Sequence, residues 1–425
     1  MKNEFKDYLN EGKDYYKKDE FEKSIESYTK AIEINPQGLR AYILRGSIKV
    51  KLNDLNGAVE DFSKAIEIDP KNSRANCLRG VAKVLLEDFF GAVEDFSKAI
   101  KINPNFEVAY RHRGLAKEKL SDLNGAIKDY SQAIKINPNN EDAYFFRAEC
   151  KYESKDLKGA IEDYSKAIEI NPNNEDTYFF RAECKYESKD LKGAIEDYSK
   201  AIEINPDSSS YKKRGLVRYK SDDYKGAIDD FTKAIEINPR CETTYFHRGI
   251  ANHELNDLNG AIEDFSRAIE NNPYDANSYF NRAICKYEQK SLNALVFNSE
   301  LGKYESKDLK GVIEDLSKAI EINPNDPNSF FNRAVCKYES KDLKGSIDDY
   351  TKLIEINPKE EDAYINRGIC KYELEEYKSS IVDFSKAIEI NPKYGRTYMR
   401  RGCAKHKLGN KENAGEDFQK WRKYR

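Results

Sequence analysis

The residue types that most often carry chemistry are all present, but their spacing does not build a catalytic site. The four histidines have no second histidine or cysteine at a spacing typical of a metal site. No glycine-rich phosphate loop and no nucleophile elbow is present, and the Asp and Glu residues recur at the same places along the chain. We therefore predict no catalytic residues, no metal site and no cofactor. The histidines are expected on a groove or surface: His112, His247, His253 and His406.

Five of the eight cysteines also recur at one place in a repeating pattern, where other copies carry alanine. Exchange with alanine indicates a small, buried contact between helices. Equivalent residues of stacked helices lie ~8–10 Å apart, beyond the ~7 Å limit for a disulfide, so we expect packing and not redox chemistry. The five are Cys150, Cys184, Cys285, Cys336 and Cys370.

A third recurring set pairs an arginine with an aspartate, as in Arg147 and Asp163. Both types are present in every copy from the second on, whereas the first copy holds Glu11 and Ser27 at the two places. This joint absence predicts that the two side chains meet within a copy, where a guanidinium can bind a carboxylate through two parallel hydrogen bonds. The alternative is that both are solvated residues carried along by duplication.

The element that positions these residues is a unit of 34 residues, seen in 139–172 and copied in 173–206 with one change, Ala143 to Thr177. Each copy holds two stretches with apolar residues at helical spacing, separated by Lys-Gly and closed by Asn-Pro, which predicts a helix, a turn and a second helix. Neither helix can bury its apolar stripe alone. Stacking the next pair on top completes the burial.

Counting back from each closing proline predicts a single continuous array over residues 1–425. One residue is missing near 206–210, so the turn into the seventh unit must differ. A 17-residue irregularity at 288–304 is either an insertion or two repeats collapsed by deletion, and it predicts a prolonged first helix or a bulging loop. The twelve units begin near residues 5, 39, 73, 107, 141, 175, 208, 242, 276, 327, 361 and 395.

Position by position, these units resemble the tetratricopeptide repeat family. The family's aromatic fourth residue and small eighth residue match Tyr144 and Ala148, and its later alanine, aromatic and alanine match Ala160, Tyr164 and Ala167. The resemblance covers nearly all of the chain. It implies an all-α fold, an α-solenoid with the form of a right-handed superhelix of about twelve helix-turn-helix repeats, whose first helices line a concave groove.

Charge and hydropathy argue against several classes of partner. The chain has 75 acidic and 72 basic residues interleaved along its length, so no broad basic field is available to attract nucleic acid or a membrane surface. The N-terminal residues contain no apolar core of signal-peptide length, and no stretch approaches the ~18 apolar residues of a membrane span. We expect a cytoplasmic protein.

The resemblance places positions 2, 5, 6, 9, 12 and 13 of each first helix on the groove. In repeats five and six these positions combine aromatic rings with carboxylates, which suits a peptide with apolar and basic side chains. The alternative is that the rings pack against neighbouring first helices. The predicted groove residues are Phe145, Phe146, Glu149 and Tyr152, and then Phe179, Phe180, Glu183 and Tyr186.

Towards the C-terminus the sixth position becomes Asn281, Asn332 and Asn366, followed by Arg400, with Arg396 one turn earlier. Such asparagines resemble the ladder with which some long tetratricopeptide superhelices bind a peptide backbone. Asn366 and the two arginines also resemble part of a carboxylate clamp that holds an acidic C-terminus. Two positions depart from that clamp, since its lysine and asparagine are replaced by Phe331 and Val335.

These features predict a non-enzymatic scaffold that binds peptide segments of partner proteins in the groove. Two alternatives remain: a helical, substrate-recruiting subunit of an enzyme complex, and a structural protein that self-associates end to end. Trp421 replaces an alanine of earlier repeats, and we expect it to lie over the exposed end of the array, where it could also contact a partner or a second copy of the chain. The partners expected are proteins or peptides, with no nucleic acid and no membrane.

Overall fold

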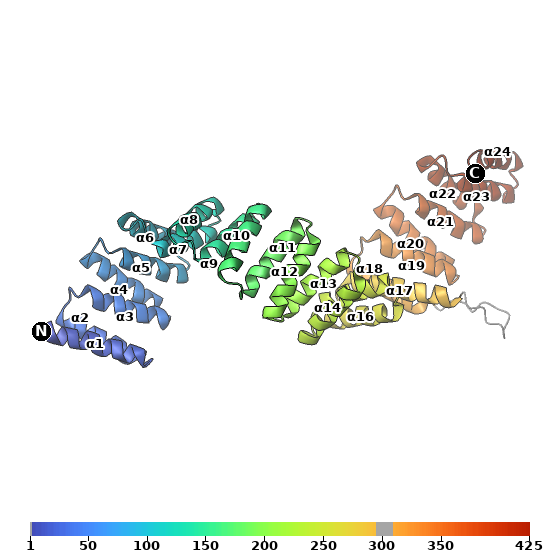
Figure 1. The fold of residues 1–425 in the computed structure, drawn as a ribbon. Helices are drawn as coiled ribbons and strands as arrows, with labels where there is room; N and C mark the ends of the chain where they lie inside the picture. The colour runs from blue at the N-terminus through green and yellow to red at the C-terminus, as the bar shows by residue number, and fades with distance from the viewer. Residues whose placement is uncertain (1, 295–308) are drawn as a thin grey trace. The chain divides into compact units, whose positions relative to one another are not determined.

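The computed structural model describes the backbone of residues 2–294 and 309–425, and the side chains of residues 3–289 and 309–425. The chain divides into two compact units, residues 1–206 and residues 207–425 (Figure 1). In each unit every helix packs on the next one along the chain, so that the helices form successive pairs. The predicted continuity of one array across both units stays a prediction.

The first unit contains six helix pairs, each with a first helix, a short turn and a second helix. They are α1 (Lys2–Lys17) with α2 (Phe21–Ile34), α3 (Leu39–Lys51) with α4 (Leu55–Ile68), α5 (Ser73–Leu85) with α6 (Phe89–Ile102), α7 (Glu107–Lys119) with α8 (Leu123–Ile136), α9 (Glu141–Glu153) with α10 (Leu157–Ile170), and α11 (Glu175–Glu187) with α12 (Leu191–Ile204).

The second unit has the same organisation. Its pairs are α13 (Ser208–Lys220) with α14 (Tyr224–Ile237), α15 (Glu242–Glu254) with α16 (Leu258–Asn271), α17 (Ala276–Ala294) with α18 (Lys310–Ile322), α19 (Pro327–Glu339) with α20 (Leu343–Ile356), α21 (Glu361–Glu373) with α22 (Tyr377–Ile390), and α23 (Gly395–Lys407) with α24 (Lys411–Lys423).

The turn inside each repeat differs from the prediction. The sequence suggested that Lys-Gly separates the two helices, but α10 already begins at Leu157, so Lys158 and Gly159 lie in its first turn. The break comes earlier, at Lys155, whose φ is +66°. Asp156 then caps α10 by accepting a hydrogen bond from the Gly159 N–H at 3.0 Å. A Cβ at residue 159 would lie too close to the capping carboxylate, so the aspartate side chain would have to move to make room for it.

Small residues hold the helices close together, as the sequence predicted. A Cβ at Gly46 would lie 2.9 Å from the ring of Phe62 on the partner helix, closer than real contacts allow. Cys150 is buried against Ala126 and Tyr130 of the preceding repeat. Because the other four recurring cysteines are buried as well and all eight thiols are free, the predicted packing role is confirmed.

The predicted arginine–aspartate pair is present in every repeat from the second to the twelfth. In repeat five, Arg147 donates from Nε and Nη2 to the two carboxylate oxygens of Asp163 at 2.7 and 2.6 Å. Its third nitrogen, Nη1, donates to Ser131 of the preceding repeat at 3.0 Å. Lys151, one turn after the arginine, lies 2.8 Å from the same aspartate, whose side chain is 5% exposed.

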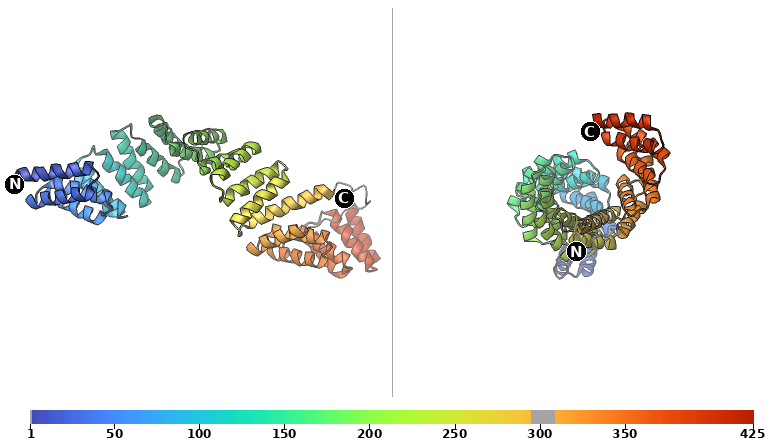
Figure 2. Two further views of the ribbon diagram at one scale, coloured as in Figure 1. Left: turned by 90° about the horizontal axis from the view of Figure 1, so that it is seen from below. Right: turned by 90° about the vertical axis from the view of Figure 1, so that its right-hand side faces the viewer.

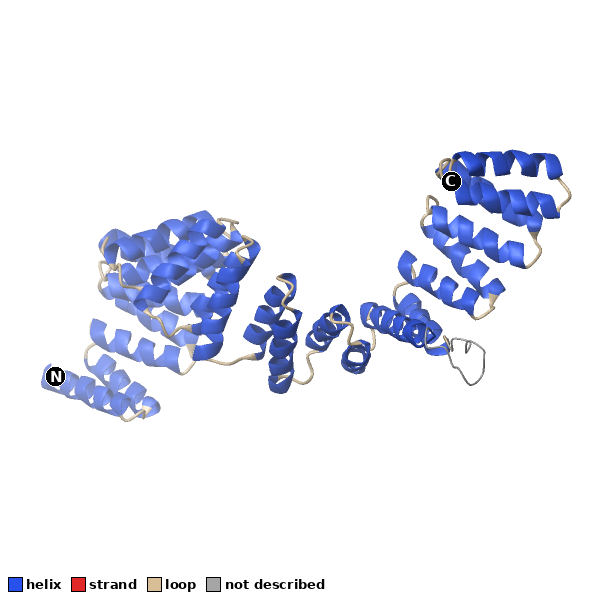
Figure 3. Ribbon diagram, turned by 45° about the vertical axis from the view of Figure 1, so that its right-hand side comes forward, coloured by secondary structure: helices blue, strands red, loops and turns tan. Residues whose placement is uncertain are grey.

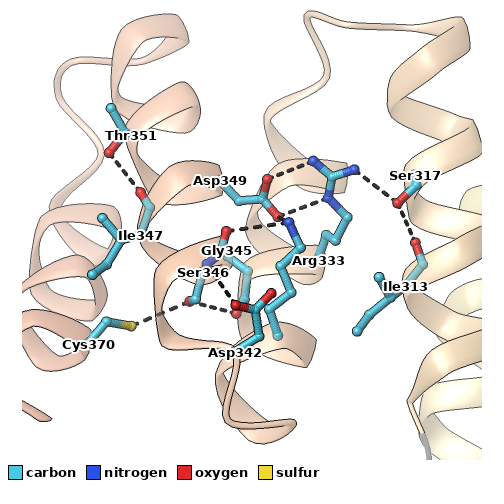
Figure 4. Close-up of polar contacts among 12 residues, drawn as sticks. Ile313, Ser317, Arg333, Asp342, Gly345, Ser346, Ile347, Asp349, Thr351 and Cys370 are labelled. Carbon is cyan, nitrogen blue, oxygen red and sulfur yellow. Dashed lines mark hydrogen bonds and ion pairs between the residues drawn. The ribbon is translucent and has the colours of Figure 1, made fainter. Parts of the chain in front are cut away.

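This cluster therefore joins three helices, whereas the sequence predicted a contact between two. Figure 4 shows the equivalent arrangement in repeat ten, where Arg333 contacts Asp349 of its own repeat and Ser317 of the repeat before. Breaking a buried, fully hydrogen-bonded ion cluster costs more than losing a surface pair. The cluster fixes the position of each first helix against two second helices.

The ninth repeat keeps this contact despite its irregular length. Arg282 bonds Asp315 at 2.9 and 2.6 Å, although the two residues are 33 apart in sequence instead of the usual 16. The first helix, α17, has 19 residues instead of 13 and is visibly longer than its neighbours (yellow in Figure 2). The extra length thus belongs to one repeat, and its first part prolongs α17. Most of the predicted irregular stretch, from residue 295 on, lies outside the described residues.

The chain's last residues fold back on the final first helix. The ring of Tyr424 stacks on that of Tyr398 with centroids 6.0 Å apart, and the guanidinium of Arg425 lies 5.8 Å from the ring of Trp421. Trp421 itself is half-buried on α24. Throughout the described residues the secondary structure is helical, with no strand (Figure 3), which confirms the predicted all-α fold of helix-turn-helix repeats.

Candidate functional site

The candidate site is the face formed by the first helices of successive repeats, here called the first-helix face. These helices contact not only their own second helix but also the first helix of the next repeat, as α5 contacts α7 and α7 contacts α9. Direct contact between alternate helices is expected on the inner side of a curved stack. Clefts lie on this face in both units.

In repeats five and six the predicted aromatic residues contact one another across helices. The ring of Phe145 lies edge-on to that of Tyr164 on its own second helix, with centroids 5.6 Å apart, and 5.7 Å from that of Phe180. Phe146 stacks on Tyr130 of the preceding repeat at 6.0 Å. The predicted alternative, packing between neighbours, therefore describes part of their role. The rings are half-buried, so part of each surface also faces solvent.

The second copy repeats this geometry. Phe179 lies edge-on to Tyr198 at 5.5 Å, and Phe180 stacks on Tyr164 of the preceding repeat at 6.4 Å. The sixth position therefore stacks on an aromatic residue of the repeat before. Tyr186, also predicted for the groove, is half-buried further along α11.

Carboxylates lie beside these rings. Burial, followed by the nearby charges of Glu118 and Glu153, raises the pKa of Glu149 to about 7. Glu183 accepts a hydrogen bond from the hydroxyl of Tyr198. Tyr152 donates its hydroxyl hydrogen to a glutamate of the next repeat. This part of the first-helix face is acidic and aromatic.

In the second unit, two of the three predicted asparagines use their amide nitrogen within their own helix. Asn281 donates to the carbonyl of Asn277 at 2.8 Å, and Asn332 donates to the carbonyl of Asn328 at 2.9 Å. Both amides keep their oxygen as an acceptor for a ligand. Asn332 also lines a small cleft between α17 and α19.

Asn366 and Arg400 come together in the neighbouring cleft. This cleft has a volume of about 310 Å³ and is also lined by Tyr338 and Val335. Arg400 extends as well into the next cleft, of about 190 Å³, which is lined by apolar side chains of α21 and α23. Arg396 lies one turn earlier on α23 and is exposed. The structure therefore brings together two of the three residues of the predicted acidic-peptide site.

A further cleft on this face, of about 490 Å³, was not predicted. It lies between α1, α3 and α5, and its lining includes Lys6, Lys13, Arg40 and Arg74 beside apolar residues such as Leu44. The sequence did contain a signal, because a basic residue occupies the second position of each of the first three repeats. In later repeats the second position varies, being Asp142 and Asp176 in the fifth and sixth repeats and Arg396 in the twelfth.

The histidines and cysteines form no metal centre in the described part of the chain, where no group of three or more His, Cys, Asp or Glu could hold an ion. His112 stacks on Phe96 with ring centroids 5.9 Å apart, and burial lowers its pKa to about 4. Its imidazole is therefore neutral at physiological pH. None of the described helices combines the length and apolar character that crossing a membrane requires.

The chain was compared with solved structures and with curated proteins. YrrB, described as a TPR protein with an unusual peptide-binding site, is 25% identical over 44% of this chain and 96% of its own, with a TM-score of 0.39. A tetratricopeptide repeat protein from Parabacteroides merdae is 19% identical over 59% and 99%, with a TM-score of 0.44. Yeast Tom70 is 18% identical over 99% and 92%, with a TM-score of 0.35. No curated protein matches the chain.

Models of the tetratricopeptide repeat match both units. Those described as "Tetratricopeptide repeat" match residues 5–37, 141–174, 175–208, 212–276, 361–394 and 395–420. A model described as "TPR repeat" matches residues 46–86 and 119–150. Together these ranges cover more than half of the chain, and most of them begin and end close to the bounds of a helix pair described above. The chain belongs to the tetratricopeptide repeat family.

Proposed function

We propose that the chain is a non-enzymatic scaffold that binds peptide segments of partner proteins on its first-helix face. The observation that carries the proposal is a row of clefts in the second unit, one at each step from α17 to α23. The sixth-position residues Asn332, Asn366 and Arg400 line successive clefts. A row with one polar group per repeat suits an extended peptide, which presents backbone groups at regular intervals.

The walls of these clefts supply the apolar part of the contact. Val335, Ile369 and Met399 line the same clefts as the polar groups. An apolar pocket with a few polar groups is the usual composition of a binding site, in which burial supplies affinity and hydrogen bonds supply orientation. Arg400 lines both the cleft that contains Asn366 and the apolar cleft beside it. Its guanidinium would bind a carboxylate, and the apolar cleft would hold an apolar side chain. The proposed ligand therefore carries these two groups side by side.

The test uses a labelled peptide that contains Asp and Leu residues, with binding followed by fluorescence anisotropy. We expect Arg400→Ala to weaken binding about tenfold, since a desolvated charge pair is lost, and Asn366→Ala to weaken it less. Arg396→Ala should have a smaller effect than Arg400→Ala because Arg396 lies at the exposed rim. Lys386→Ala is the control, as this lysine pairs with Glu389 on the exposed side of α22.

Unchanged affinity in the combined Asn366→Ala and Arg400→Ala variant would remove the C-terminal site from the proposal. If peptides of acidic, basic and neutral composition all fail to bind the native chain, the scaffold function itself is wrong. Circular dichroism of each variant checks that the helices are retained.

A further inference from the structure

The cleft at the N-terminal end of the first unit is lined by a group of basic side chains. Four cationic side chains line it, Lys6 and Lys13 from α1, Arg40 from α3 and Arg74 from α5. Its lining residues include no aspartate and no glutamate. The cleft therefore concentrates positive charge in a chain whose net charge is only −3.

The four cations differ from the lysines that follow the cluster arginines in the ion pairs they form. Lys49 and Lys83, for example, each bind the buried aspartate of their own repeat, at 3.0 and 2.9 Å. Within the described residues, none of the four cleft cations forms an ion pair, and Lys6, Lys13, Arg40 and Arg74 all have exposed side chains. Their charge is available to a ligand.

The sign of the charge reverses along the first unit. The second position of the repeat is Lys6, Arg40 and Arg74 in the first three repeats, but Asp142 and Asp176 in the fifth and sixth. Complementary charge selects partners mainly by excluding those of the wrong sign. An acidic ligand is thus attracted to the N-terminal cleft and repelled from the first-helix face of repeats five and six.

The floor of the cleft indicates a protein ligand. Leu44 and Ile48 of α3 line it, together with the ring of the buried Tyr28. This apolar floor fits an aliphatic or aromatic side chain between two charged ones. A long polyanion such as a nucleic acid would extend past the cleft onto the carboxylates of repeats five and six. A short acidic segment would not.

We propose that this cleft binds a short segment of a partner protein in which Asp or Glu residues flank an apolar side chain. The arginines bind carboxylates through paired hydrogen bonds, the lysines act as point charges, and the apolar side chain packs on Leu44 and Ile48. The inference rests on the proposed scaffold function for its general mode of binding. It names a separate site and the chemistry of the ligand for that site.

The test measures binding of a labelled peptide of four Glu residues around a central Leu to the full chain carrying Arg400→Ala, so that the C-terminal site contributes little. We expect the combined variant Lys6→Ala, Arg40→Ala and Arg74→Ala to weaken binding at least tenfold and to reduce its dependence on salt. The matched control removes three exposed lysines of the second helices in the same unit, Lys98, Lys101 and Lys135, and should leave the affinity unchanged. Leu44→Asp should also weaken binding.

Three outcomes would overturn the inference. One is equal affinity in the triple-alanine variant and the control. Another is tighter binding of a single-stranded oligonucleotide of the same net charge, which would assign the cleft to nucleic acid. The third is loss of all acidic-peptide binding on Arg400→Ala alone, which would place the acidic ligand at the C-terminal clefts and leave the scaffold function intact. Circular dichroism confirms that each variant remains helical.

Discussion

At the scale of single residues, the eighth repeat contains a natural variant of the recurring ion cluster. Most repeats bind the buried aspartate with both an arginine and a lysine, but here Asn252 stands in place of the lysine and donates to Asp264 at 2.9 Å. Burial raises the pKa of Asp264, and the hydrogen bonds of Arg248 do not fully offset it. At Asp417, by contrast, burial is outweighed by Arg401 and its neighbouring lysine, and the pKa is lowered.

We therefore predict that Asn252→Lys stabilises the second unit by roughly 1 kcal/mol at neutral pH. A carboxyl group whose pKa is raised by folding penalises the folded state while it is ionised, and the penalty disappears as the pH falls through the folded-state pKa. The gain from the added lysine should therefore shrink in acid. Urea unfolding at pH 7 and near pH 3 measures it. An equal gain in stability at both pH values would contradict the explanation. The reverse substitution in the second repeat, Lys49→Asn, should lower the stability at neutral pH.

The raised pKa of Glu149 predicts pH-dependent binding at repeats five and six. With a pKa of about 7, this carboxyl group is partly protonated at neutral pH and binds a cationic side chain only when ionised. The affinity for a labelled peptide of Lys and Phe residues should increase as the pH rises from 6 to 8. Glu149→Gln should remove most of this increase. Glu162→Gln, an exposed residue of α10, is the control, and a pH dependence that persists in Glu149→Gln would assign it to another group.

The residue scale also shows what sequence reasoning could find and what it missed. The pairing of Arg147 with Asp163 was predictable because both types are absent together from the first repeat. The hydroxyl of Ser131 was not recognised as the arginine's further partner, because serine is also common on exposed helix surfaces. The basic N-terminal cleft was not predicted, because the groove residues inferred from the sequence came from repeats five and six and from the last four repeats, and the basic residues of the first three repeats were not among them.

At the scale of the helix pair, the turn depends on two residues that act together. Asp156 caps α10, and Gly159 leaves room for the capping carboxylate. Periodicity predicted that a turn exists, but it misplaced the break by interpreting the glycine as a helix breaker. The start of the second helix can be recognised from an aspartate followed three residues later by a glycine, because the third residue after the cap donates the hydrogen bond to it.

This coupling predicts a non-additive pair of substitutions. Asp156→Ala should cost about 1 kcal/mol through loss of the cap, and Gly159→Ala should also destabilise because its Cβ displaces the aspartate. In the Asp156→Ala background the clash is gone, so Gly159→Ala should become neutral or stabilising by up to about 1 kcal/mol, the difference in helix propensity. A double-mutant cycle measured by urea unfolding tests this. Strictly additive effects would show that the glycine has another role.

At the scale of the whole molecule, the period of 34 residues was enough to predict an all-α array, because each helix pair needs only its neighbours to bury its apolar surface. The period alone does not predict where the chain divides into compact units. The division at residues 206 and 207 falls where one residue is missing from the repeat, and the sequence predicted only an altered turn there. Within each unit the regular spacing is what lets the arginine clusters connect one repeat with the next.

This division makes a prediction about fragments. A cut after residue 206 leaves six complete helix pairs on each side, so residues 1–206 and 207–425 should each fold alone, with helical circular dichroism and cooperative unfolding. A cut after residue 172 instead separates Phe180 from Tyr164, and Cys184 from its buried contacts with Ala148 and Ala160. The fragment 1–172 should therefore expose an apolar face and be less soluble and less stable per repeat than 1–206. If the two fragments have the same free energy of unfolding per repeat, the division at residue 206 has no effect on stability. Stability would then depend only on the number of repeats.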